Sequence, residues 1–152
     1  MTAQWWPTPR SVANPGWQVT QRIRFADEPS IPSANTAATG AKVTALGSDV
    51  AAVFSNAPEL TARLQTAAGA AGENIWELPL HQPYLKAYQK NTIADLKNSD
   101  LNPAGASIKA ALFLSQFVTR PWAHLDIAGN AAKEDVATGW GVGTLTEFVL
   151  GG

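Results

Sequence analysis

The sequence contains no cysteine and few of the side chains that most often carry out catalysis. Without cysteine, a disulfide framework, a thiolate zinc site and a cysteine nucleophile are all excluded. Two histidines and a charged fraction of 15% leave few candidates for acid–base chemistry among the 152 residues. The net charge of −1 argues against a general binder of nucleic acid or another polyanion. No apolar run approaches the roughly 20 residues of a membrane-spanning helix, so we expect no membrane partner.

Acidic residues are also missing from the first part of the chain, where Asp27 is the first of them. The same part is rich in tryptophan and proline, and prolines at this spacing rarely permit regular elements. We therefore expect residues 1–35 to be irregular, apart from one short strand or helix at Gln18–Ala26. Met1–Trp6 lacks the apolar run of a secretory signal, so we expect no signal peptide and a cytoplasmic protein.

From Ala41 onward the pattern of apolar residues is that of an α/β domain. Short apolar runs with β-branched or aromatic residues predict extended segments. These segments are Ala41–Leu46, which ends at Gly47, then Val50–Phe54, Ile75–Leu80 and Trp122–Ala128.

Helical spacing is clearest at Pro58–Ala71, where leucines and alanines recur three or four residues apart. Asn56 is placed to cap this helix at its start, and Gly72 to end it. A second strong helix is predicted at Ala104–Val118, and shorter ones at Pro83–Lys90 and Thr144–Leu150. The inward face of the second strong helix is expected to comprise Ile108, Ala111, Leu112, Ser115 and Phe117.

The order of these elements predicts an α/β fold with a mixed, largely parallel sheet flanked by helices. Parallel neighbours in a sheet need crossover connections. The helices expected at Pro58–Ala71 and Ala104–Val118 are long enough to provide them.

The most tempting chemical pair is His124 and Asp126, which would face the same side of a strand. An imidazole beside a carboxylate can bind a metal or form a base with its orienting partner. Both side chains can equally be structural polar groups at a strand end, and we favour that interpretation because two ligands make a poor metal site. His81 stands alone after Pro79 and Leu80, and a surface position is the simpler interpretation.

A glycine-rich loop at Thr138–Thr144 precedes the last predicted helix. Such a loop can cradle an anion on the amides of a helix start, which would make the chain a binder of a small ligand. It lacks both the dinucleotide-binding spacing and a P-loop lysine, so we favour a turn that packs closely on its neighbours.

Several segments in consecutive order resemble the C-terminal part of the leucyl (cytosol) aminopeptidase family of metallopeptidases. The most specific are WAHLDIAG at Trp122–Gly129 and AGASIKAALFLSQFV at Ala104–Val118. The others are TGAKVTALG (Thr39–Gly47), FSN (Phe54–Asn56), WELPL (Trp76–Leu80), IADLKN (Ile93–Asn98) and ATGWGVGTLTEFVL (Ala137–Leu150). The resemblance implies that residues 36–152 are the C-terminal portion of such a catalytic domain, and that residues 1–35 are unlike the family.

This resemblance implies a hexameric, cytoplasmic enzyme that removes N-terminal amino acids from peptides. It also implies two divalent metal ions, manganese or zinc, that activate water and polarise the peptide carbonyl. Five residues match positions that contact substrate in the family: Thr39 and Gly40 in a turn, Ser99 near the site for the second residue, and Ala128 and Ala131 in the side-chain pocket. An alanine at 131 would widen that pocket. No catalytic residue and no metal ligand is carried over.

The sequence departs from the family at the metal-binding signature, Asn-Thr-Asp-Ala-Glu-Gly-Arg. That signature would fall before Thr39, in a region with no acid ahead of Asp27. Oxygen-rich metal sites need carboxylates to offset the charge of the ions. We therefore expect a truncated or frame-disrupted gene, whose neighbouring DNA would encode the signature in another frame.

Two principal hypotheses follow for the function. The chain is a member of an aminopeptidase that acts only with metal ligands from elsewhere, or it is a non-catalytic remnant or oligomerisation module. Loss of upstream strands would leave a sheet edge uncovered, and an uncovered edge favours association. We therefore expect self-association as a homo-oligomer.

Overall fold

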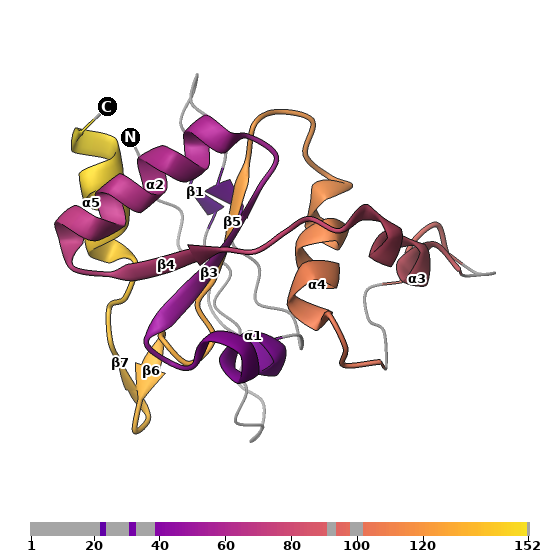
Figure 1. The fold of residues 1–152 in the computed structure, drawn as a ribbon, viewed down its shortest axis with the longest axis horizontal. Coiled ribbons are helices and arrows are strands. Elements are labelled where there is room, and N and C mark those ends of the chain that lie inside the picture. Colours follow the sequence, from indigo (N-terminus) through magenta and orange to yellow (C-terminus); the bar gives the residue numbers. More distant parts are fainter. Residues whose placement is uncertain (1–21, 24–30, 33–38, 91–93, 98–101, 152) are drawn as a thin grey trace, which may run out of the picture.

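A computed structural model describes residues 22–23, 31–32, 39–90, 94–97 and 102–151 of the chain. Its centre is a three-stranded mixed sheet in the order β4–β3–β5 (Figure 1). β3 (Val50–Ser55) pairs in parallel with β4 (Asn74–Glu77) and antiparallel with β5 (Ala123–Asp126). The predicted α/β class with a mixed sheet is confirmed. "Largely parallel" is wrong for this sheet, which has one parallel and one antiparallel pair.

Two helices cover one face of the sheet and lie side by side (Figure 1). They are α2 (Pro58–Ala71), whose predicted bounds are confirmed, and α5 (Val142–Leu150). Their apolar stripes meet the inward side chains of β3 and β5 in a core formed by Val53, Leu60, Leu64, Ala67, Ala123, Leu125 and Phe148. α2 ends as predicted at Gly72, whose φ of 71° is left-handed and favours glycine.

The opposite face is covered by α1 (Thr39–Leu46) and α4 (Ala106–Ser115). The buried core on this side is formed by Ala52, Phe54, Ala111 and Trp122, with Leu46 and Ile108 packed against it. Ala111 and Leu112 are buried on α4 as predicted. Phe117 is not inward, because the helix ends before it and its side chain is 66% exposed.

Short elements complete the described chain. Between β4 and α4 lie a 3-10 helix, η1 (Gln82–Leu85), and α3 (Lys86–Gln89), in place of one predicted helix. β1 (Arg22–Ile23), within the predicted Gln18–Ala26 element, pairs with β2 (Ile31–Pro32). β6 (Ala132–Lys133) pairs with β7 (Val136–Ala137) in a second small hairpin. In the described part of the chain, no helix is both long and apolar enough to span a membrane.

The prediction of a strand at Ala41–Leu46 is wrong, because these residues belong to α1. Alanine, lysine and leucine favour a helix, and they outweigh the two β-branched residues among them. Thr44 donates its hydroxyl to the Gly40 carbonyl one turn back, at 3.0 Å. Gly47 then ends the helix with a φ of 72°, and its N–H donates to the Val43 carbonyl.

Two further expectations about the helices are wrong. Asn56 does not cap α2, since its Oδ1 accepts the Trp122 N–H at 2.9 Å and Ala57 is the N-cap residue. α4 is not a crossover between parallel neighbours, because the chain passes from β4 to β5, which lie on opposite sides of β3. Asn56 thus joins the ends of β3 and β5 rather than starting a helix.

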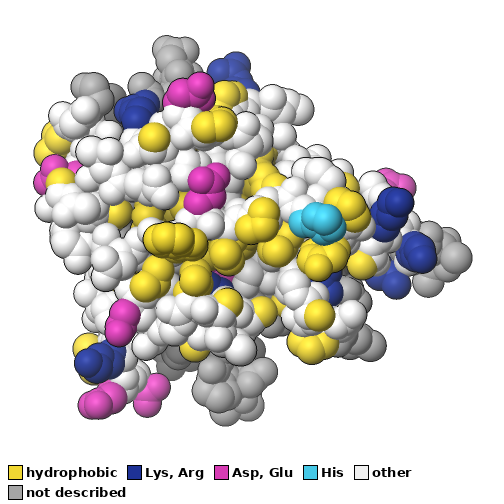
Figure 2. Space-filling view, viewed as in Figure 1, with side chains coloured by type: hydrophobic (Ala, Val, Ile, Leu, Met, Phe, Trp, Pro, Cys, Tyr) yellow, Lys and Arg dark blue, Asp and Glu magenta, His cyan; other side chains and the backbone are white. Residues whose placement is uncertain are grey.

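An apolar band crosses the surface over β4 and the segment that follows it (Figure 2). Trp76 on β4 is 64% exposed and Tyr84 on η1 is 42% exposed. Leu78 and Leu80 lie between them and are half-buried against the core below. His81 is exposed and packs edge-to-face on Tyr84, with 4.7 Å between ring centroids, as expected for a surface histidine.

Candidate functional site

A buried lysine joins α1 to the loop after β5, the two segments that carry most of the candidate substrate residues. Lys42 on α1 is 0% exposed. Its Nζ donates to the Gly47 carbonyl at 3.0 Å, to the Ala128 carbonyl at 2.7 Å, and to Asn130 Oδ1. An ammonium has three N–H groups, so the three acceptors account for all of them.

The electrostatic setting of Lys42 is a balance of opposing effects. Burial lowers the pKa of the Lys42 ammonium from 10.5, while the nearby carboxylates of Asp126 and Asp49 act to raise it. Its direct acceptors are two backbone carbonyls and one amide oxygen, all uncharged. Removal of the ammonium would therefore leave buried acceptors without a donor, which is costly.

The structure places four of the five predicted substrate residues on α1 and on the loop after β5. Thr39 and Gly40 are the first residues of α1, and Gly40 is exposed. Ala128 and Ala131 are half-buried in the loop after β5. Ser99 lies outside the described residues. The substrate roles of all five remain predictions.

The loop after β5 approaches α1 closely at Gly129. A Cβ built on Gly129 would lie 3.0 Å from Val43 Cγ2 and 3.3 Å from the Ser48 Cα, and φ there is 77°. Both the limited space and the backbone conformation therefore favour glycine. The loop is closed internally, because the N–H groups of Asn130 and Ala131 both donate to the Ile127 carbonyl at 3.0 Å.

His124 and Asp126 lie on the same face of β5, as the strand spacing predicts, and both are buried. The His124 ring stacks on Phe54 at a centroid distance of 5.8 Å. Asp126 Oδ1 accepts the Ala128 N–H at 3.1 Å and so shapes the turn that leads into the loop. These contacts support the structural interpretation of the pair.

The glycine-rich loop does hold an anion at the start of α5, and that anion belongs to the chain. Glu73 Oε1 accepts the Gly141 N–H at 2.8 Å, and Oε2 accepts the Thr144 N–H at 3.0 Å. Oε2 also accepts the Thr144 hydroxyl. A carboxylate at this position completes the hydrogen bonding of the helix start and complements its dipole. The loop is therefore a capped helix start, which argues against the hypothesis of an external small ligand there.

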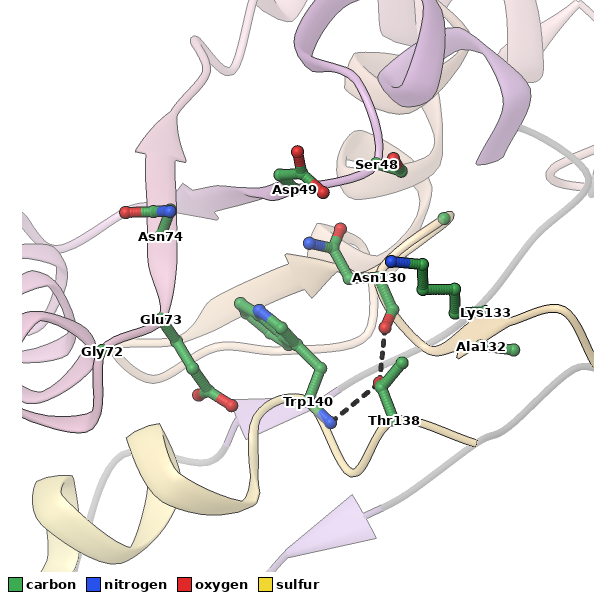
Figure 3. A pocket seen from close by; sticks show the side chains of 11 residues that line it. Ser48, Asp49, Gly72, Glu73, Asn74, Asn130, Ala132, Lys133, Thr138 and Trp140 are labelled. Atoms are coloured by element: carbon green, nitrogen blue, oxygen red, sulfur yellow. Dashed lines mark hydrogen bonds between the residues drawn. The ribbon is translucent and has the colours of Figure 1, made fainter. Parts of the chain in front are cut away.

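A cavity of about 490 Å³ lies beside this cap and the loop after β5 (Figure 3). Asp49 and Asn74, near the starts of β3 and β4, form one wall, and Lys133 on β6 lies across from them. The Trp140 side chain reaches between these walls, and the backbone N–H of Trp140 donates to Thr138 Oγ1 at 3.1 Å. Glu73 also lines the cavity, and its carboxylate is directed toward the start of α5 (Figure 3).

The donor groups of the described residues do not fit a two-metal centre. Within residues 22–23, 31–32, 39–90, 94–97 and 102–151, no three histidine or carboxylate side chains cluster as metal ligands would. Asp126 and Glu73 are each engaged by backbone N–H groups. No chemical step through a metal is therefore assigned to these residues.

Sequence reasoning missed two residues that shape this region, Lys42 and Glu73. A lysine among the apolar residues of Ala41–Leu46 is a weak signal, because lysines commonly lie on exposed helix faces. Glu73 directly follows the Gly72 that ends α2, which suggests an exposed turn. The partners of Glu73 lie 68 and 71 residues away, and nothing local indicates them.

Comparison with known proteins places this fold among peptidases. Among solved structures, a tomato leucine aminopeptidase mutant matches with a TM-score of 0.72 and 38% identity, over 80% of this chain and 24% of that one. The bottromycin maturation enzyme BotP in complex with Mn matches with a TM-score of 0.69 and 34% identity, over 77% of this chain and 27% of that one. The α/β architecture described above is thus that of part of a leucine aminopeptidase.

Sequence comparison then identifies the family. The family model "Cytosol aminopeptidase family, catalytic domain" matches residues 26–146. The chain is 49% identical over 120 residues to a "Probable cytosol aminopeptidase" of Synechococcus sp. (strain JA-3-3Ab), covering 74% of this chain and 23% of the relative. The match to that of strain WH7803 is 46% over 120 residues, covering 73% and 24%. This chain belongs to the cytosol aminopeptidase family, and it spans about a quarter of the length of these relatives.

Proposed function

We propose that this chain forms part of the substrate-binding wall of a metal-dependent aminopeptidase, which removes N-terminal amino acids from peptides. One observation carries the proposal: Lys42 holds the start of α1 against the loop after β5. Thr39 and Gly40 lie on the first of these segments, and Ala128 and Ala131 on the second. The small side chains at 128 and 131 leave room for the side chain of an N-terminal residue.

The same proposal assigns the chemistry to groups beyond those described. Two divalent ions, manganese or zinc, would supply the activated water when bound, and BotP is a related structure that contains Mn. The wall residues of this chain would orient the N-terminal amino acid, with Ser99 near the second residue of the peptide. Domain limits of 36–152, a hexamer and a cytoplasmic location are part of this proposal.

A metal titration with a leucine-derived chromogenic substrate tests the enzymatic hypothesis. The full chain is assayed with increasing manganese or zinc, and with Ala131→Phe as the matched variant. Hydrolysis above the blank, with a higher KM for Ala131→Phe because its ring narrows the pocket, would support catalysis. Hydrolysis with the same KM in the unaltered chain and in Ala131→Phe would contradict the assignment of Ala131 to the substrate wall.

The alternative is a non-catalytic remnant or oligomerisation module, which the lack of a fitting donor set in the described segments favours. This hypothesis predicts no hydrolysis at any metal concentration together with a defined oligomer by analytical ultracentrifugation. Hydrolysis that follows the bound metal stoichiometry would exclude it.

A further inference from the structure

The strongest unexplained feature is the position of the buried Lys42 side chain. A buried ammonium is costly, because burial removes its hydration shell. A methionine could fill the same space on α1 without that cost. The presence of a buried ammonium with three N–H donors at position 42 therefore needs a structural reason beyond packing.

The geometry of the acceptors supplies one. One acceptor, the Gly47 carbonyl, is at the end of α1 itself, and fixes the ammonium to the helix. The other two, the Ala128 carbonyl and Asn130 Oδ1, belong to the loop after β5, 86 and 88 residues further along the chain. A hydrogen bond holds the distance between its donor and acceptor to within a few tenths of an ångström, whereas apolar contact alone tolerates sliding.

We infer that Lys42 is a positioning residue that sets the spacing between the two halves of the substrate wall. The inference rests on the proposed function, since it takes Gly40 and Ala131 to face the same amino acid. Lys42 itself touches no substrate in this arrangement, because its side chain is fully buried and its three donors are in use. It acts through the loop, which lies so near α1 that a Cβ on Gly129 would come within 3.0 Å of Val43 Cγ2.

The chain offers a matched control in a second buried lysine. Lys109 on α4 is 4% exposed, and its Nζ donates to the Asn102 carbonyl at 2.6 Å, away from the loop after β5. Lys109→Met therefore removes a buried ammonium from a different helix, and its bond to the Asn102 carbonyl does not involve the loop after β5. Asn130→Ala removes one acceptor from the opposite side of the Lys42 contact.

Amide hydrogen exchange of the full chain tests the positioning directly. In Lys42→Met we expect the Asn130 and Ala131 amides to exchange at least about tenfold faster, while Leu78, bonded to the Val53 carbonyl, is unchanged. Asn130→Ala should produce the same loosening, and the double variant should add little because the two residues share one contact. Wild-type exchange at Ala131 in Lys42→Met, or equal loosening in Lys109→Met, would overturn the inference.

Binding of L-leucinamide, measured by calorimetry with and without manganese, tests the link to substrate. We expect Lys42→Met to bind about tenfold more weakly than Lys109→Met, at a temperature where both are folded. Equal affinities would overturn the positioning role even if exchange shows loosening. No binding by the unaltered chain would instead overturn the proposed function, while the exchange result still decides whether Lys42 holds the two segments together.

Discussion

Removal of the Glu73 carboxylate should weaken the attachment of α5 to the rest of the fold. The carboxylate accepts two N–H groups at the start of α5 and one hydroxyl. Thr144 is 0% exposed, so its N–H and hydroxyl would be left without a partner in Glu73→Ala. An unsatisfied buried polar group costs about 1–3 kcal/mol, and loss of a helix cap about 0.5–2 kcal/mol.

These contributions overlap, because the cap and the satisfied groups are partly the same bonds. We therefore expect Glu73→Ala to lower the free energy of unfolding by about 3 kcal/mol. Glu73→Gln keeps one acceptor oxygen but loses the charge that complements the helix dipole, so it should lose about half as much. Glu77→Ala, at an exposed position on β4, is the control and should change stability by less than about 0.5 kcal/mol.

Urea unfolding followed by circular dichroism measures the free energy of unfolding of Glu73→Ala, Glu73→Gln and Glu77→Ala relative to the unaltered chain. Exchange of the Leu145 amide, which donates to the Gly141 carbonyl at 2.9 Å, reports the first turn of α5 locally. The reasoning would be refuted if Glu73→Ala were no less stable than Glu77→Ala. It would also be refuted if Leu145 kept its protection, because the cap would then not hold the helix start.

Three other perturbations test separate parts of the structure. Asp135 has a φ of 64° in the β6–β7 turn, so Asp135→Gly should stabilise by about 0.5–1 kcal/mol and raise Tm, whereas Asp135→Ala should lower it. Burial lowers the pKa of Lys42 in the folded chain below the 10.5 of the unfolded chain. Between the folded and the unfolded pKa, unfolding therefore takes up a proton, and the contribution of Lys42 to stability rises with pH toward 10.5. The difference in unfolding free energy between the unaltered chain and Lys42→Met should therefore grow as pH approaches 10.5, and a constant difference would contradict this. Trp76→Lys should reduce self-association in light scattering, because it places a charge on the exposed β4 strand.

Elements whose signals are local could be predicted from the sequence. α2 has a proline in its first turn and a left-handed glycine at its end, and its bounds are those predicted. The strand at β5 followed from a short apolar run, and all four of its residues are buried. α1 was assigned wrongly because Val43 and Thr44 were given more weight than the helix-favouring alanine, lysine and leucine residues around them.

The candidate site depended on information that periodicity does not contain. The positions of Gly40 and Ala128 were proposed from a family resemblance, and the fold then brought their segments together. Lys42 and Glu73 make their decisive contacts with residues 68 to 88 positions away. Such contacts follow from the packing of the sheet and helices, and a one-dimensional pattern cannot indicate them.

Two carboxylates of the described chain, Asp126 and Glu73, are engaged by backbone N–H groups of the chain itself. Asp126 shapes the turn before the loop through the Ala128 N–H, and Glu73 caps α5. A metal bound to Asp126 would compete with that N–H and would shift the Ala128 carbonyl on which Lys42 depends. Asp126 therefore could not bind an ion without disturbing the loop that the proposed function assigns to the substrate wall. The metal-dependent activity proposed above would therefore depend on carboxylates from outside the segments that the structure describes.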